Sequence, residues 1–230
     1  MICSSSFTPR FVALALAALV GGAAAPAAAD EPAKAAGAPV HPLSAAELDA
    51  FLARFAAMPG LSAKFREEKT MALLAAPLIN EGVIYFASPG RLARHTTAPV
   101  KSSVIIDGER MTFGDSRGVD AVSFEQNPVL GLFVTSFVKI FAGDKEALAK
   151  MYAMELRGDP AGAWALKLRP QISPMDQVIA GIELVGDGLV VKSMTVDEVG
   201  GDRSVTTFTE VNTARRFTDA ELTELFKVAR

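Results

Sequence analysis

The chain has little of the chemistry on which most enzymes depend. Its 230 residues include one cysteine, Cys3, and two histidines, His41 and His95. A single cysteine excludes an intramolecular disulfide. Because His41 falls in a segment that we expect to be disordered, one histidine is left, too few for a multi-histidine zinc site. No glycine-rich phosphate-binding motif occurs in the sequence. We therefore expect no enzymatic activity, no metal and no cofactor.

Two short motifs offer catalytic alternatives, and neither is complete. Gly114-Asp115-Ser116 resembles the start of a serine esterase motif, but a serine nucleophile needs a base, usually a histidine. In that esterase family the histidine follows far downstream, where this chain has none. The same residues are typical of a turn, which we favour. Glu67 and Glu68 are neighbours on an expected strand and point to opposite faces, so they do not converge, and we expect a solvated face.

Charge and hydropathy restrict the partners and the location. Lys and Arg total 23 and Asp and Glu total 26, without a basic cluster, which argues against a nucleic acid partner. Residues 11–20 form an apolar run between the single early cation, Arg10, and the small residues Ala27-Ala28-Ala29. The run is too short to span a membrane, which needs about 20 apolar residues. The pattern is typical of a secretory signal peptide, residues 1–29.

Cleavage after Ala29 would make the chain a periplasmic protein that begins at Asp30. Cys3 lies in the removed segment, ahead of the apolar run, so it is not the acylated cysteine of a lipoprotein. Residues 30–42 are rich in Ala and Pro and predict a disordered leader. The remainder, residues 43–230, has the size of one domain.

Periodicity after residue 42 predicts an α+β fold. A capping box from Ser44 to Glu47 opens a first helix, which Pro59-Gly60 ends. Alternating apolar and polar residues, with hairpin turns such as Asp107-Gly108, then predict two sets of strands. The strands are expected at residues 61–66, 82–86, 91–97, 102–106 and 110–113, and again at 152–157, 164–169, 178–185, 189–196 and 203–211. This order implies an antiparallel sheet with helices packed on one face.

A helix with a broad aromatic face separates the two sets of strands at residues 128–141. Three phenylalanines recur four residues apart on it. The helix is either an ordinary core helix or a cover over the mouth of a curved sheet, and its place between the strand sets favours the cover. A short helix is expected at residues 145–150, and a second capping box, Thr218 to Glu221, opens a C-terminal helix.

Several short motifs stand in a fixed order between residues 61 and 108. They are Leu61-Ser62-Ala63-Lys64-Phe65, Gly82-Val83-Ile84-Tyr85-Phe86, Ser88-Pro89-Gly90-Arg91-Leu92, Pro99 and Asp107-Gly108. In this order and register they resemble the LolA family, the periplasmic carriers of outer-membrane lipoproteins. The resemblance implies an incomplete antiparallel β-barrel, a half-barrel, with helices covering a hydrophobic cavity. It also implies a cargo of lipoprotein acyl chains, received from an inner-membrane ABC transporter or similar exporter and delivered to an acceptor lipoprotein at the outer membrane.

The chain departs from the family pattern at two positions. Ser88 stands where the family has an arginine that holds the lid, and Leu92 stands where the family has an aromatic residue. The cargo therefore stays open between a lipoprotein and another lipid, such as a polyene or a glycolipid. Arg91 and Arg94 are the nearby replacements for the arginine. If Leu92 faces inward, Arg94 shares its face near the cavity mouth, with its guanidinium toward water or a partner. If the register shifts by one residue, Arg91 faces inward instead.

The expected cavity is built from inward residues of the strands and from the aromatic face of the long helix. The strand residues are Phe65, Ile84, Phe86, Leu92 and Trp164, and the helix residues are Val129, Leu130, Phe133, Val134, Phe137, Val138 and Phe141, with Phe133, Phe137 and Phe141 as the ceiling. Arg91 and Arg94 are candidates for a lid latch or a headgroup ligand. We expect a monomeric carrier that buries acyl chains. The alternative is a periplasmic lipid-binding sensor or regulator on the same half-barrel.

Overall fold

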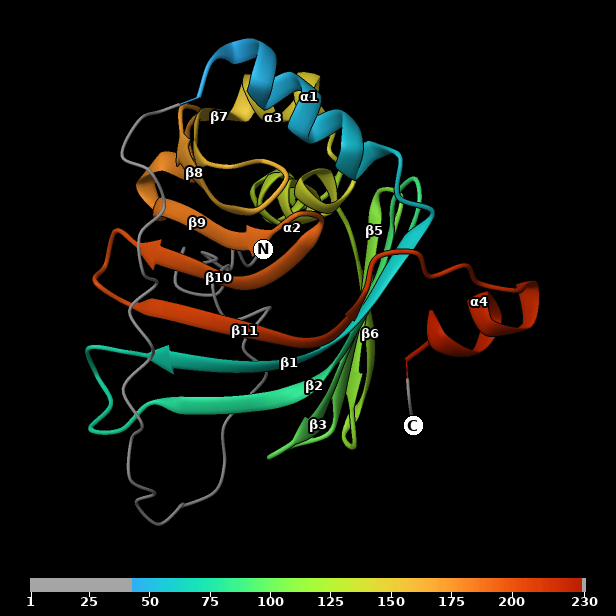
Figure 1. Ribbon diagram of the computed structural model, residues 1–230. Helices are drawn as coiled ribbons and strands as arrows, with labels where there is room; N and C mark the ends of the chain where they lie inside the picture. The colour runs from blue at the N-terminus through green and yellow to red at the C-terminus, as the bar shows by residue number, and fades with distance from the viewer. Residues whose placement is uncertain (1–42, 229–230) are drawn as a thin grey trace.

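One antiparallel sheet of eleven strands forms the frame of the computed structural model, which describes residues 43–228 (Figure 1). The signal peptide and leader predicted for residues 1–42 lie outside the described residues. The strand order is β6-β5-β4-β3-β2-β1-β11-β10-β9-β8-β7, so the two strand sets join where β1 pairs with β11. The sheet curves without closing and leaves β6 and β7 as its two edges. This confirms the half-open α+β fold predicted from the sequence.

Every predicted strand is present, with ends that differ by a few residues. The first set comprises β1 (Gly60–Thr70), β2 (Leu78–Ala87), β3 (Arg91–Ala98), β4 (Ser102–Asp107), β5 (Arg110–Asp115) and β6 (Gly118–Ser123). The second set comprises β7 (Tyr152–Gly158), β8 (Ala163–Pro170), β9 (Ile179–Asp187), β10 (Val190–Glu198) and β11 (Arg203–Asn212).

Strand β6 is the one that the sequence analysis missed. Its residues are exposed or half-buried, because an edge strand covers little core. A strand without a buried face has no alternating pattern to detect. The hairpin between β5 and β6 turns at Ser116-Arg117, where the Asp115 carboxylate accepts hydrogen bonds from the backbone and the side chain of Arg117. Of the residues predicted as a turn, only Ser116 lies in it, because Gly114 and Asp115 are the last two residues of β5.

Four α-helices and one 3-10 helix accompany the sheet in the described chain. They are α1 (Ala45–Ala56), α2 (Pro128–Phe141), α3 (Lys145–Met151), η3 (Met175–Gln177) and α4 (Asp219–Leu225). Both predicted capping boxes are present, at the starts of α1 and α4. Gly143 separates α2 from α3, since its φ of 60° is in the left-handed region and a Cβ there would lie 2.3 Å from the Leu52 carbonyl oxygen. Only glycine fits this position, so α2 ends here.

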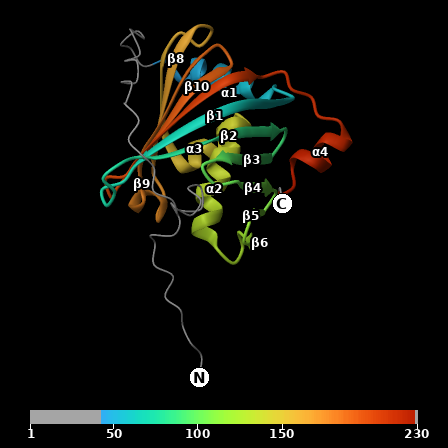
Figure 2. The same cartoon turned by 90° about the horizontal axis from the view of Figure 1, so that it is seen from below.

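The helices lie on both faces of the sheet. Figure 2 shows α2 and α3 inside the curve of the sheet and α4 outside it. On the outer face, His95 Nε2 donates a hydrogen bond to the Leu225 carbonyl oxygen (2.7 Å). The ring of Phe217, just before α4, lies 6.2 Å from that of Tyr85. The prediction that the helices pack on one face is wrong for α4, because α4 buries no side chain whose spacing would reveal its face.

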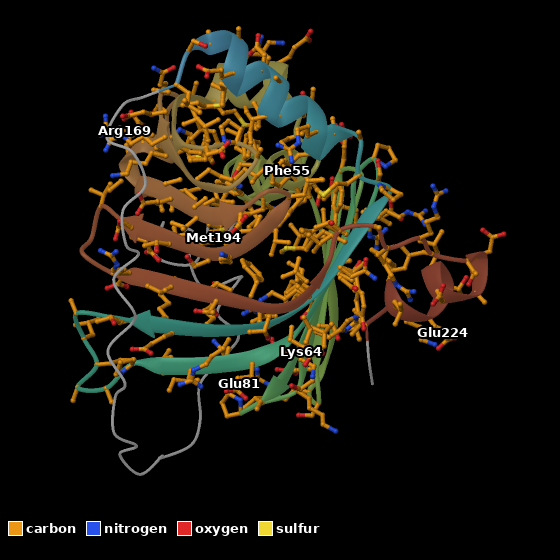
Figure 3. The ribbon with its side chains drawn as sticks, in the orientation of Figure 1. Phe55, Lys64, Glu81, Arg169, Met194 and Glu224 are labelled. Carbon is orange, nitrogen blue, oxygen red and sulfur yellow. The ribbon has the colours of Figure 1, made fainter. Side chains whose placement is uncertain are left out.

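Helix α1 packs over the second strand set through Trp164. The ring centroids of Phe51 and Phe55 lie 4.8 and 5.9 Å from that of Trp164, and Figure 3 shows Phe55 beneath α1. The indole Nε1 donates to the Gly188 carbonyl oxygen (2.9 Å). Trp164 therefore belongs to the core under α1. None of the helices between residues 43 and 228 is long and apolar enough to cross a membrane.

Candidate functional site

A cavity of about 40 Å³ lies between the concave face of the sheet and α2. Its lining is mostly apolar, with three polar side chains. The apolar lining consists of Phe65, Ile84, Leu92, Val104, Ile106, Phe137, Phe141, Met194 and Phe208, and the polar lining consists of Glu67, Arg94 and Thr206. The lining comes from strands that are far apart in sequence, on both sides of the β1–β11 junction.

Strand register explains why these residues share one surface. On β3, Leu92 pairs with Phe86 of β2 and Ile106 of β4, so three apolar side chains form a row across the sheet. Two residues further along β3, Arg94 pairs with Ile84 and Val104. Since side chains alternate between faces, every second residue of each strand reaches the cavity side.

Helix α2 closes the cavity with the aromatic face predicted for it. Phe137 and Phe141 line the cavity, and the Phe141 ring centroid lies 6.2 Å from that of Phe86. Phe133 is buried beside Phe137, with ring centroids 5.1 Å apart, but it is outside the lining. The remaining predicted helix residues pack around this face: Val134 and Val138 are buried and Leu130 is half-buried, while the side chain of Val129 lies outside the described residues.

A buried ion pair stands inside this apolar lining. Arg94 Nη2 donates to Glu67 Oε2 at 2.9 Å, and the two side chains are 8% and 7% exposed. Asn80 Nδ2 donates to the same carboxylate oxygen (3.0 Å), and Arg94 Nη1 donates to Thr96 Oγ1 (3.3 Å). The guanidinium also lies 4.2 Å above the centre of the Phe65 ring. Burial lowers the pKa of Arg94 from its ordinary value, and the charge and hydrogen bond of Glu67 oppose that shift.

A glycine is required on β2 beside Phe65 and the backbone of β3. Gly82 pairs with Phe65 across the sheet, and a Cβ at this position would lie 1.9 Å from the His95 carbonyl oxygen and 2.9 Å from the Phe65 ring. No side chain fits between β2 and β3 here without moving the backbone. The family motif that begins at Gly82 therefore has a steric reason for its glycine in this chain.

A second buried ion pair follows on the same face of β1. Lys69 Nζ lies 2.8 Å from Glu198 Oε1 of β10, with side chains 3% and 14% exposed. Along the inner face of β1, Ala63 and Phe65 are thus followed by Glu67 and Lys69. The concave surface changes along the strand from apolar to ionic.

Three expectations about individual side chains require correction. Glu67, expected on a solvated face, is buried against Arg94, because it shares the inner face with Phe65. The Arg94 guanidinium, expected near water at the cavity mouth, is buried in the pair. Trp164, expected in the cavity, lies in the core under α1. Of the two registers left open for β3, the structure has the one in which Arg94 faces inward with Leu92. Arg91 is exposed, and its Nε lies 3.1 Å from Asp107 Oδ2.

Two of the lining residues that the sequence analysis missed carried a usable signal. Val104 and Ile106 alternate on β4 as Leu92 and Arg94 do on β3, so pairing the two strands in register would have added them. Met194, Thr206 and Phe208 gave no such local signal, because their place depends on the β1–β11 junction. Figure 3 shows Met194 on β10, in the second strand set.

Outside the cavity, the one histidine of the described chain is already engaged in hydrogen bonds. His95 lies on the outer face, where Nε2 donates to the Leu225 carbonyl oxygen (2.7 Å) and Nδ1 lies 2.9 Å from Ser103 Oγ. The ring is thus engaged with α4. Between residues 43 and 228, no three His, Cys, Asp or Glu side chains gather in a way that could hold a metal ion.

Comparison with known proteins gives a family match over most of the chain. Residues 38–225 match the model of a family described as outer membrane lipoprotein carrier protein LolA-like. Matching solved structures include a LolA superfamily protein from Nitrosomonas europaea, 8% identical over 75% of this chain and 96% of that chain, with a TM-score of 0.44. The Mycobacterium tuberculosis lipoprotein LppX is 11% identical over 74% and 97% of the two chains (TM-score 0.38), and MucB is 17% identical over 77% and 62% (TM-score 0.47). No curated protein matches the chain.

Proposed function

Because the chain belongs to the LolA-like family of outer membrane lipoprotein carrier proteins, we propose that it binds acyl chains in the cavity under α2 and ferries them toward the outer membrane. The cargo is a lipoprotein or another lipid with acyl chains. The observation that carries this proposal is the aromatic face of α2, whose Phe137 and Phe141 lie over an apolar sheet surface.

The physical task of such a carrier is to shield acyl chains from water and still release them. Each buried CH₂ group is worth about 0.8 kcal/mol, so free acyl chains do not cross an aqueous space unaided. The cavity of about 40 Å³ has room for no more than a few water molecules. An acyl chain needs far more volume, so α2 must move away from the sheet when cargo enters. Helix movement of this kind lets cargo exchange without a chemical step.

The Glu67–Arg94 pair gives the proposed cavity a polar region among apolar walls. The acyl chains lie along the apolar lining in this proposal, and the polar part of the cargo lies toward the pair. Because the two charges neutralise each other, the pair suits a polar or zwitterionic group as well as an anionic one.

The proposed route follows from the family and from the N-terminal sequence. The chain is exported, loses residues 1–29 and works in the periplasm as a monomer. An inner-membrane exporter, ABC or similar, hands over the cargo, and an outer-membrane lipoprotein accepts it.

The test is to identify what the protein carries when it is purified from cells. Lipid extracted from the protein and identified by mass spectrometry should contain acyl chains in a fixed ratio to protein, and the lipid should pass unchanged to acceptor membranes. The Phe137→Glu variant serves as the control and should purify without lipid. Conversion of the lipid would indicate an enzyme. Bound lipid that is never transferred, but that changes binding to a protein partner, would indicate a sensor instead.

A further inference from the structure

The turn between β1 and β2 presents an uncharged apolar surface to solvent. Residues 71–79, Met-Ala-Leu-Leu-Ala-Ala-Pro-Leu-Ile, contain no charged side chain, and we call them the apolar tip. Leu73 is 85% exposed, Leu74 42% and Ile79 37%. Single exposed apolar residues are common on protein surfaces, but a contiguous run at the end of a hairpin is not. Figure 1 shows this hairpin at the left side of the sheet, away from α1 and α4.

A second turn lies beside the apolar tip and adds to it. Thr70, at the end of β1, pairs with Arg203 at the start of β11, so the turn between β10 and β11 is adjacent. The Ala72 backbone N–H donates to Asp202 Oδ1 across the two turns (3.1 Å). Val199 in this second turn is 56% exposed. The two turns therefore form one end of the half-barrel, with apolar side chains outermost.

We propose that the apolar tip docks the protein on a lipid bilayer by inserting Leu73 and Leu74 between the lipids. The shape of the tip favours a bilayer over a protein partner. A stable protein interface takes about 800 Å² from each partner. Two leucines at the end of a two-stranded turn offer much less, whereas a narrow apolar projection fits between lipid headgroups.

The charges behind the apolar tip indicate which bilayer it suits. Lys69 is paired with Glu198, and Arg203 lies 3.4 Å from Asp197. Asp202 is held by the Ala72 N–H. No excess of positive charge therefore surrounds the tip in the described chain, and anionic lipids gain nothing there. We infer that docking is driven by apolar burial, takes place on zwitterionic lipids and changes little with salt.

Docking through the apolar tip would fix the orientation of the half-barrel. Glu67 and Lys69 lie on the stretch of β1 that leads to the tip, whereas α1 adjoins the opposite end of β1. A docked molecule thus turns the ionic end of its concave face toward the membrane. The inference goes beyond the proposed function, because docking requires no particular cargo and its measurement does not depend on which cargo is bound.

The experiment uses the full chain, in the form that cells accumulate, and phosphatidylcholine vesicles without protein. The Leu73→Ser/Leu74→Ser variant should bind about tenfold more weakly for each leucine, since burial of a leucine is worth at least one factor of ten in affinity. Val119→Ser changes a residue that is 48% exposed on edge strand β6, and as the matched control it should bind like the wild type.

A fluorescent reporter tests whether the tip itself enters the bilayer. Trp164 is the only tryptophan and is 1% exposed, so it contributes a constant background. Brominated phosphatidylcholine should quench the new indole in Leu73→Trp and not that in Val119→Trp. If the protein does not bind the vesicles, the proposal is wrong; this is the result expected of a tip that docks on a protein partner. An unchanged affinity in the leucine double variant, or equal quenching of the two reporters, also overturns the proposal.

Discussion

Arg94 Nη2 lies 2.9 Å from Glu67 Oε2, inside a cavity whose other walls are almost entirely apolar. Removing two charges from water costs several kcal/mol per ion, and their attraction offsets this only when the geometry and the remaining hydrogen bonds are good. Asn80 and Thr96 supply further hydrogen bonds here. The pair therefore adds little net stability, but each partner depends strongly on the other.

We predict that Glu67→Leu lowers the free energy of unfolding by about 3–5 kcal/mol, because Arg94 is then buried without its counter-ion. The Glu67→Leu/Arg94→Leu variant should recover most of this loss. The matched control is Glu81→Ala, which breaks the Arg66–Glu81 pair between β1 and β2, with both side chains 50% exposed. Glu81→Ala should lower the free energy of unfolding by at most about 1 kcal/mol. Urea unfolding measures the free energy of unfolding of all three variants. A loss in Glu67→Leu no larger than that in Glu81→Ala would contradict the prediction.

Loss of the Glu67 charge should also change the selectivity of the cavity. In Glu67→Gln the guanidinium of Arg94 is no longer neutralised, so it can bind an anionic headgroup with a charge-assisted hydrogen bond, worth about 1.5–3 kcal/mol. We expect the affinity for a fatty acid, relative to its methyl ester, to rise about tenfold or more. The ratio cancels any general effect of destabilisation. Arg91→Gln, which alters the exposed arginine, should leave the ratio unchanged.

The sequence predicts most of the fold because most strands have one buried face. Alternation along β1, from Leu61 through Phe65, is visible without any knowledge of the partners. β6 and the face occupied by α4 could not be predicted, since neither buries a patterned set of side chains. The predicted strands also do not reveal that β1 and β11 pair, which joins the two sets into one sheet.

The site was less predictable than the fold, because its polar part depends on contacts between strands. Alternation places Glu67 on the same face as Phe65, yet an isolated carboxylate is more often solvated than buried. Its burial is explained by Arg94 of β3, whose guanidinium extends past β2 and donates a hydrogen bond to the Glu67 carboxylate. Part of the apolar lining, by contrast, follows from the pattern along α2 and from Phe65, Ile84 and Leu92.

The junction between α2 and α3 should respond to acid. Asp144 caps α3 and accepts a hydrogen bond from Lys139 at the end of α2 (2.7 Å), which holds the pKa of its carboxyl below the ordinary value. A lowered folded-state pKa stabilises the protein above the unfolded pKa of about 3.9, and this stabilisation is lost as the pH falls through the folded value.

We therefore expect Asp144→Asn, which keeps a capping side chain, to be less stable than the wild type by up to about 1 kcal/mol at pH 6, since the pair is about one-third exposed. The difference should shrink toward zero as the pH falls below 4. Lys139→Met removes the same ion pair from the other side and should show the same trend. Thermal unfolding across this pH range measures both, and a difference independent of pH would show that the ion pair is not its cause.

Export predicts a particular N-terminus. Residues 1–29 carry the pattern of a signal peptide, so the intact mass of the periplasmic protein should correspond to a chain starting at or near Asp30, without acylation. Cys3 is removed with the signal peptide in this prediction. Full-length protein in the membrane fraction would contradict it.

The role of α2 as a movable cover can be separated from a purely structural role by one substitution. Phe137 lines the cavity and is 5% exposed, so Phe137→Glu places a carboxylate in the proposed path of the cargo. Burial of an unpaired carboxylate is costly, and the helix can avoid the cost only by turning toward water. Uptake of a fluorescent fatty acid should therefore be lost, while the circular dichroism spectrum is kept. Phe226→Glu, at the end of α4 on the outer face, is the matched control and should leave uptake intact. If Phe137→Glu abolishes uptake and folded structure together, α2 is ordinary core, and the carrier proposal loses its movable cover.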